Sequence, residues 1–335
     1  MGEVAAAIVD SPTRRARPRD TGPMSDPTNY RIRRGGYRAE VSSSGAALRV
    51  LEHETADGPY PLTESWPANE RPPLRSGTVL APWPNRIRDG HFYFDGIEHQ
   101  LALTEPERGN AVHGFVWHRD WVLVSHNDFR VEQALDVGLH KGWPYQLRLT
   151  VSHEVGDDGL TVTHTATNVG GYHSPFGLGV HPYVRAGDAS LDECTLRLAA
   201  GTRLPMDPGR GLPNAYSQPV EDTDFDFTSP RSLRGVELDA PYSALDVDVD
   251  GRARHDLRGP DGRGVRLWAG REFGWLQVFT AGAVPELEYP GRGRALALEP
   301  MTCPPDAFNL GIDLVVLQPG QTWTGRWGLT ALLSA

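Results

Sequence analysis

The sequence predicts an all-β protein, folded as an antiparallel β-sandwich or barrel with very little helix. Several stretches alternate apolar and polar residues with a period of two, which is typical of half-buried antiparallel strands. Asp-Gly and Gly-Gly pairs, which favour tight hairpin turns, separate these stretches. We find no amphipathic helix pattern of three turns in the sequence, and the abundant glycines and prolines also favour strands and turns.

The alternation is clearest in 146–154, where Leu147, Leu149 and Val151 fall on one face and polar residues on the other. The other expected strands are shorter or less regular. The expected strands are 46–51, 131–139, 146–154, 160–167, 176–180, 265–268 and 295–298. The expected turns are Asp89-Gly90, Asp95-Gly96, Asp158-Gly159, Gly170-Gly171, Asp250-Gly251 and Asp261-Gly262.

The domain organisation is expected to be simple. Residues 1–30 are rich in Arg, Pro, Asp and Ser and have little to bury, which predicts a disordered N-terminal tail. Because no linker-like stretch follows, we expect 31–335 to form a single domain. The chain is expected to close with a hairpin, in which the turn Gln318-Pro319-Gly320 joins 313–317 to 322–329.

Composition narrows the possible partners. The formal charge of −10 argues against nucleic acid, whose binding proteins carry basic patches. No apolar run in the sequence approaches the length of a membrane span. The two cysteines, Cys194 and Cys303, form no CxxC motif, so we expect a reducing compartment, the cytoplasm. We also expect a monomer or a homodimer.

The stretch SPFGLGVHPY, 174–183, is the first candidate for chemistry. Pro182 disfavours a helical conformation for His181, so we expect His181 at a strand end, where its side chain faces a cleft. Histidine titrates near neutral pH and is suited to proton transfer. The alternative is a histidine that is simply hydrogen-bonded at a strand terminus.

The stretch ALALEPMTCPPDAFN, 295–309, is the second candidate for chemistry. Glu299 follows an apolar run and precedes Pro300, which predicts a carboxylate at the end of a buried strand. Removal from water would raise its pKa and make it a better base. The alternative is a capping or salt-bridged glutamate.

Three other stretches carry weaker signals. Prolines stiffen the loop LAPWPNRIRDG, which presents Asn85 and the fork-shaped guanidinium of Arg86. In NAVHGFVW, Gly114 would let a ligand approach His113 closely. Asp239 is expected in a turn. The histidines at 113 and 118 do not have the spacing of a metal pair, so no metal is expected.

WPNRI with an Asp-Gly turn, HGFVW, GLGVHPY, and LEP followed by PPDAFN occur in this order along the chain. Together they resemble the aldose 1-epimerase (galactose mutarotase-like) family over roughly 37–329. The resemblance implies a large antiparallel β-supersandwich.

The resemblance also implies roles for single residues. It makes His181 the general acid and Glu299 the general base. It assigns Arg86 to the substrate hydroxyls and His113 to a place beside the ring oxygen, with Asp239 as the best match to a further substrate-binding aspartate. Asn85 precedes Arg86 in the same motif and is also expected to bind the substrate.

The implied reaction interconverts the α and β anomers of a hexopyranose. Glu299 would take the proton of the anomeric O1, and a charged His181 would donate one to the ring oxygen O5. The ring opens to the aldehyde, the C1–C2 bond rotates and the ring closes again. This chemistry needs an acid and a base but no metal or redox cofactor.

Three other functions remain open from the sequence. A glycoside hydrolase would use Glu299 and Asp239 as its carboxylate pair. A sugar-binding module would bind sugar without catalysis. An epimerase for a 6-phosphate or 6-sulfonate sugar would need cations near C6; the candidates by sequence position are Arg88, Arg119, Lys141 and Arg185.

Overall fold

The fold was analysed in a computed structural model, which describes residues 26–333. It is built almost entirely from antiparallel strands, as predicted. The described residues contain one short α-helix, α1 (Ala307–Leu310), and three 3₁₀ segments: η1 (Pro73–Arg75), η2 (Leu191–Glu193) and η3 (Pro285–Leu287). None of these described helices is long and apolar enough to cross a membrane. Both cysteines are buried and free.

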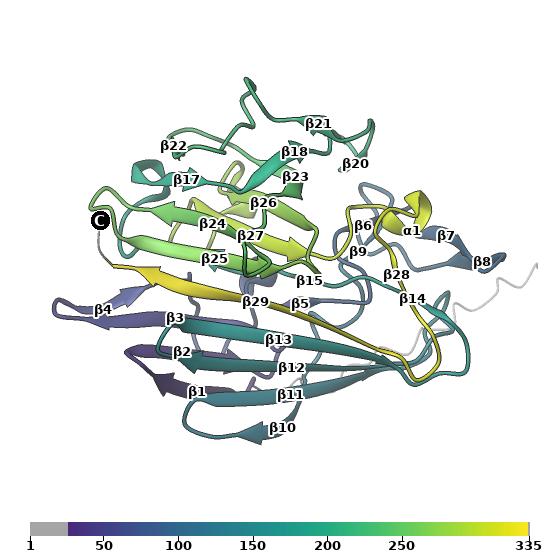
Figure 1. Ribbon diagram of the computed structural model, residues 1–335. Helices are drawn as coiled ribbons and strands as arrows, with labels where there is room; N and C mark the ends of the chain where they lie inside the picture. The colour runs from purple at the N-terminus through teal and green to yellow at the C-terminus, as the bar shows by residue number, and fades with distance from the viewer. Residues whose placement is uncertain (1–25, 334–335) are drawn as a thin grey trace, which may run out of the picture.

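A nine-stranded sheet forms one face of the molecule (Figure 1). Its strands within 130–168 bury alternate residues on the inner face; Leu147, Leu149 and Val151 are buried as the pattern predicts. In spatial order its strands are β10 (Val122–His126), β11 (Arg130–Val137), β12 (Leu147–Gly156), β13 (Gly159–Asn168), β29 (Thr322–Leu332), β25 (Gly264–Gly270), β24 (Arg252–Arg258), β17 (Thr195–Arg197) and β22 (Arg231–Ser232).

An eight-stranded sheet lies behind it and carries the residues of interest (Figure 1). All seven residues of its strand β27 are buried, which means that both faces of that strand are covered. Its strands are β21 (Gln218–Pro219), β18 (Ala200–Arg203), β23 (Asp239–Leu245), β26 (Trp275–Ala281), β27 (Ala295–Met301), β15 (Gly179–Val180) and β5 (Val79–Leu80), with β16 (Tyr183–Val184) also paired to β27.

Smaller sheets complete the fold. The pairs β6–β9 and β7–β8 lie with α1 at one end of the two large sheets (Figure 1). The four-stranded sheet is β1 (Asn29–Arg34), β2 (Tyr37–Ser42), β3 (Leu48–Thr55) and β4 (Gly58–Pro61). The two-stranded sheets are β6 (Arg86–Arg88) with β9 (Asn110–Val112), β7 (His91–Phe94) with β8 (Ile97–Gln100), β14 (Ser174–Phe176) with β28 (Val315–Leu317), and β19 (Met206–Asp207) with β20 (Leu212–Pro213).

Three predictions from the sequence differ from the structure. The predicted closing hairpin is wrong, because β28 pairs with β14 whereas β29 lies between β13 and β25, so the two strands belong to different sheets. The expected strand 176–180 is divided into β14 and β15. The tail expected at 1–30 lies mostly outside the described residues, and β1 already begins at Asn29.

Candidate functional site

His181 and Glu299 meet because strand β27 pairs with the chain on both sides of His181. Gly179 is opposite Met301, and Tyr183 is opposite Ala297, so the register places His181 opposite Glu299. The Nε2 atom of His181 lies 3.4 Å from Oε1 of Glu299, and both side chains are buried. His181 directly follows the end of β15, and so lies at a strand end as expected, but Glu299 lies inside β27 rather than at its end.

Burial favours the uncharged form of both groups. It raises the pKa of the Glu299 carboxyl well above its ordinary value, and the nearby charge of Asp239 raises it further. Burial also lowers the pKa of His181 to about 3, with the charge of Arg75 as a second cause. Of the two groups, the Glu299 carboxyl therefore holds a proton more tightly than the His181 imidazole, and the pair is expected to titrate as a unit.

Asn85 and His113 form a second, interlocked pair. The backbone N–H of His113 donates to the carbonyl of Asn85 at 2.8 Å, and the N–H of Asn85 donates to Nδ1 of His113 at 3.1 Å. Both residues have a positive φ, 54° and 61°, an uncommon backbone conformation for side chains of this size. The pair holds the His113 ring 6.0 Å from the ring of His181, centroid to centroid. Burial, with the Arg75 charge as second cause, lowers the pKa of His113 well below its ordinary value.

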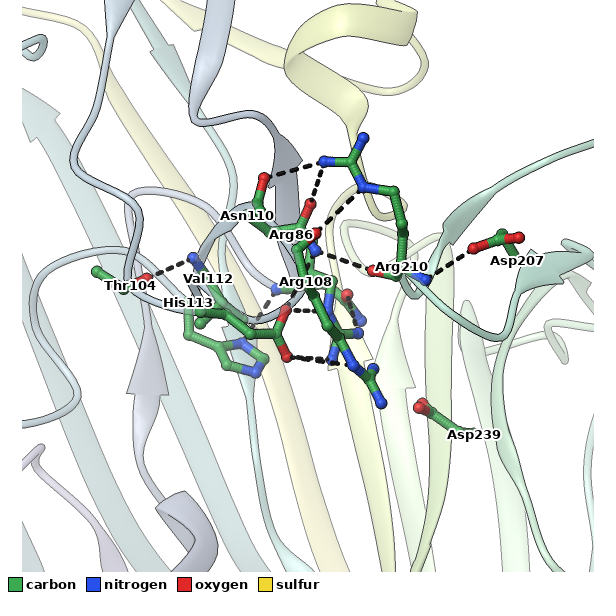
Figure 2. A network of polar contacts seen from close by, with 12 residues as sticks. Arg86, Thr104, Arg108, Asn110, Val112, His113, Asp207, Arg210 and Asp239 are labelled. Atoms are coloured by element: carbon green, nitrogen blue, oxygen red, sulfur yellow. Dashed lines mark hydrogen bonds and ion pairs between the residues drawn. The ribbon is translucent and has the colours of Figure 1, made fainter.

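Arg86 is held by a carboxylate that the sequence did not single out. Its Nε and Nη2 atoms donate to the two carboxylate oxygens of Glu105 at 2.7 and 2.9 Å. Figure 2 shows Arg86 in one view with Arg108 and Asp239. A Cβ atom on Gly211 would lie 2.8 Å from Nη1 of Arg86, so only glycine leaves the guanidinium in this place.

Gln277, which the sequence analysis did not single out, links Asp239 to Asn85. Its Nε2 donates to Oδ1 of Asp239 at 2.6 Å, and its Oε1 accepts from Nδ2 of Asn85 at 3.3 Å. Gln277 is also directly opposite Glu299 in the β26–β27 register. The available signal was a glutamine inside the otherwise apolar run WLQVF of 275–279. Asp239 is the exposed first residue of β23 rather than a turn residue.

Several polar atoms around this cluster are buried without a hydrogen-bond partner among the described residues. Buried polar groups are ordinarily satisfied, so such a group of atoms points to a site that accepts a polar ligand. Tyr183, whose ring stacks on His181, and Arg75 belong to this group and were also missed. The atoms are His181 Nδ1, Glu299 Oε2, Tyr183 Oη and Arg75 Nε.

Other candidates lie elsewhere. Trp83 and Trp143 are fully buried core residues. Arg88 is paired with Asp306, and Arg185 with Glu64 and Asp188. Arg119 donates to a backbone carbonyl, and Lys141 is exposed. Within 26–333, no group of three or more His, Cys, Asp or Glu side chains is arranged to hold a metal ion.

Solved structures support the fold. The chain superposes on a GalM/aldose epimerase homologue from C. elegans with a TM-score of 0.80, covering 91% of this chain and 98% of that one, at 20% identity. A galactose 1-epimerase from Lactobacillus acidophilus NCFM gives a TM-score of 0.72 at 19% identity, with 92% and 99% covered. At these identities the likeness shows the fold alone.

Sequence comparison extends beyond the fold. Two uncharacterised Escherichia coli K12 proteins are similar: YihR, 30% identical over 86% of this chain and 88% of its own length, and YphB, 25% identical over 90% and 98%. The family model described as aldose 1-epimerase matches residues 28–330, which includes every site residue discussed above. The chain therefore belongs to the aldose 1-epimerase family.

Proposed function

We propose that this protein is a mutarotase that interconverts the α and β anomers of a hexopyranose. The observation that carries the proposal is the 3.4 Å approach of Nε2 of His181 to Oε1 of Glu299. An anomer exchange requires one group to remove a proton from O1 and another to deliver one to O5. Two buried groups that can exchange protons, from segments far apart in the sequence, meet that requirement at a single place.

Glu299 acts as the base at O1 and His181 as the acid at O5. Burial favours the proton of the pair on Glu299 over His181, because it raises the pKa of Glu299 and lowers that of His181. Ring opening in these roles therefore needs the proton on His181 first. The short separation of the two groups allows that transfer directly between them, without any change in the total charge of the pair.

The surrounding residues hold the sugar. The Asp239 carboxylate and the Arg86 guanidinium present an acceptor and a donor for hydroxyl groups, and Gln277 connects Asp239 to the Asn85–His113 pair. Correct placement of the sugar contributes to the rate beyond acid–base catalysis, since the reacting atoms must meet both groups at once.

Exchange NMR on equilibrated D-glucose and D-galactose tests the proposal. We expect the protein to produce cross-peaks between the α and β anomeric protons at micromolar concentration, where buffer alone gives none on that timescale. Sugar binding without faster exchange would identify a non-catalytic sugar-binding module. Release of reducing sugar from an aryl glycoside would identify a hydrolase, and either result would overturn the proposal.

A further inference from the structure

The β19–β20 hairpin joins the two parts of the fold that carry Asp239 and Arg86. It follows β18 in the eight-stranded sheet, where the N–H of Leu204 donates to the carbonyl of Pro241 at 2.8 Å, within the strand β23 that begins at Asp239. Its turn reaches the β6–β9 pair, whose strand β6 begins with Arg86. Because β6 and β9 form a separate two-stranded sheet, their place relative to Asp239 depends on contacts such as those of this turn.

The turn of this hairpin is fixed by its own sequence, Asp-Pro-Gly-Arg-Gly at 207–211. Oδ1 of Asp207 accepts from the N–H of Arg210 at 2.7 Å, and the carbonyl of Asp207 accepts from the N–H of Gly211 at 2.7 Å. Gly211 has a φ of 62°, and Leu212, which follows it, is only 1% exposed. Figure 2 shows the Arg210 side chain extended between Asp207 and Asn110, so the turn directs this side chain toward β9.

The Arg210 side chain binds the loop that precedes β9 and the turn that follows β6. Its Nε donates to the carbonyl of Arg108 at 3.1 Å, and its Nη2 donates to the carbonyl of Gly109 at 3.0 Å and to Oδ1 of Asp89 at 2.8 Å. In return, Nδ2 of Asn110 donates to the carbonyl of Arg210 at 2.8 Å. An exposed ion pair such as the one with Asp89 contributes little stability, so the contacts with the backbone are the ones that hold the loop.

Asn110 connects this contact to Arg86. It is fully buried, and its Nδ2 also donates to Oε2 of Glu105 at 3.1 Å. Glu105 in turn binds the Arg86 guanidinium through both of its carboxylate oxygens. Arg210 and Arg86 are therefore joined by two intervening side chains, which lie in the loop and the strand that Arg210 holds.

We propose that Arg210 is a positioning residue, which clamps the β19–β20 hairpin onto the loop before β9 and thereby fixes the Glu105–Arg86 pair where it reaches the sugar. This inference rests on the proposed mutarotase function and adds a residue that acts through Arg86. Arginine suits the task because its planar fork binds several fixed oxygens at once. Without the clamp Arg86 is free to shift, which weakens sugar binding in the ground state and the transition state alike and so raises KM more than it lowers kcat.

The test separates positioning from stability. We would measure kcat and KM for the anomer exchange of D-galactose by polarimetry, for the wild type, Arg210→Met and Arg210→Lys, each shown by circular dichroism and urea unfolding to be folded. Arg231→Met is the matched control. Arg231 is 38% exposed against 37% for Arg210, and it binds the backbone carbonyl and the carboxylate of Asp224 at the edge of the nine-stranded sheet.

A double-mutant cycle with Arg86→Lys shows whether the effect of Arg210 passes through Arg86. We expect Arg210→Met to raise KM about tenfold and to change kcat by less than about threefold, whereas Arg210→Lys retains part of the function, since one ammonium still binds some of the same oxygens. In the Arg86→Lys background, Arg210→Met should raise KM by less than about threefold. Arg231→Met should leave KM unchanged.

An unchanged KM in Arg210→Met, or a rise in KM that persists in full in the Arg86→Lys background, would overturn the positioning role while the mutarotase function stands. If the wild type binds D-galactose without exchanging its anomers, the mutarotase function fails, and the same cycle is read from Kd by calorimetry. A loss of affinity that disappears in the Arg86→Lys background then supports the role of Arg210, and any other result overturns it. If the wild type neither exchanges nor binds the sugar, both proposals are wrong.

Discussion

Nε2 of His181 lies 3.4 Å from Oε1 of Glu299, although the two residues are far apart in the sequence. The approach follows from strand register, since β27 pairs with the strands on both sides of His181. Because both groups are buried, each resists carrying a charge, and the pair is expected to titrate as a unit.

The first prediction concerns pH. The pKa of His181 is lowered to about 3 and that of Glu299 is raised. The pair therefore carries one proton at pH values above about 3, and it loses that proton as the pH rises through the pKa of Glu299. We expect kcat/KM for a neutral hexose to show no histidine-like fall between about pH 7 and about pH 5. An acid limb centred near the ordinary histidine pKa would contradict the neutral imidazole in the free enzyme. Stopped-flow polarimetry across buffers of constant ionic strength measures the profile.

The second prediction concerns Gln277. Replacing it by Met removes the donor to Asp239 and the acceptor for Asn85. Asn85 is buried, and leaving its amide unsatisfied costs about 1–3 kcal/mol. We expect kcat/KM to fall about tenfold or more, mainly through KM.

Gln133→Met is the control for Gln277→Met. Gln133 is equally buried and donates to a backbone carbonyl away from the site. It should lose stability in urea without losing activity. If both variants lose activity in proportion to stability, Gln277 has only a structural role.

The third prediction concerns Gly211, whose φ is 62° and whose added Cβ would meet the Arg86 guanidinium at 2.8 Å. Gly211→Ala should lose about 1–2 kcal/mol of stability through its backbone and also raise KM by displacing Arg86. Gly235→Ala has the same backbone strain, with a φ of 65°, but its Cβ meets nothing within 4 Å. It should be destabilised similarly and keep its KM; an unchanged KM in Gly211→Ala would argue against substrate binding by Arg86.

The fourth prediction concerns stability at acid pH. Burial lowers the pKa of His153 to about 3, so the unfolded chain binds a proton there below pH 6.5 that the folded chain does not, and stability falls as pH falls through this range. His153→Leu should relieve about 2 kcal/mol of this loss at about pH 5 relative to about pH 8. Urea unfolding at the two pH values measures it, with the exposed His126→Leu as control. An identical pH dependence in wild type and His153→Leu would show that His153 is not held neutral.

The sequence was informative where local chemistry decides structure. Alternation identified β12 and β13, and the His-Pro pair placed His181 at a strand end, directly after β15. The sequence was misleading where tertiary pairing decides the structure. The turn at 318–320 is typical of a hairpin, but β29 pairs within the nine-stranded sheet and β28 pairs with β14.

The same distinction holds for the site. His181, Glu299, Asn85 and His113 come together, and Asp239 joins them through Gln277. The role of Gln277 depends on neighbours that are remote in the chain, Asp239 and Asn85. No local pattern encodes such neighbours.

The most direct measurement is polarimetry of freshly dissolved α-galactose with wild type, Glu299→Gln and His181→Asn, each shown by circular dichroism and urea unfolding to be folded. If the two groups act as base and acid on one sugar, each substitution should slow the catalysed relaxation by about 10²–10⁴-fold. If both variants relax the optical rotation as fast as the wild type, Glu299 and His181 are not the catalytic pair.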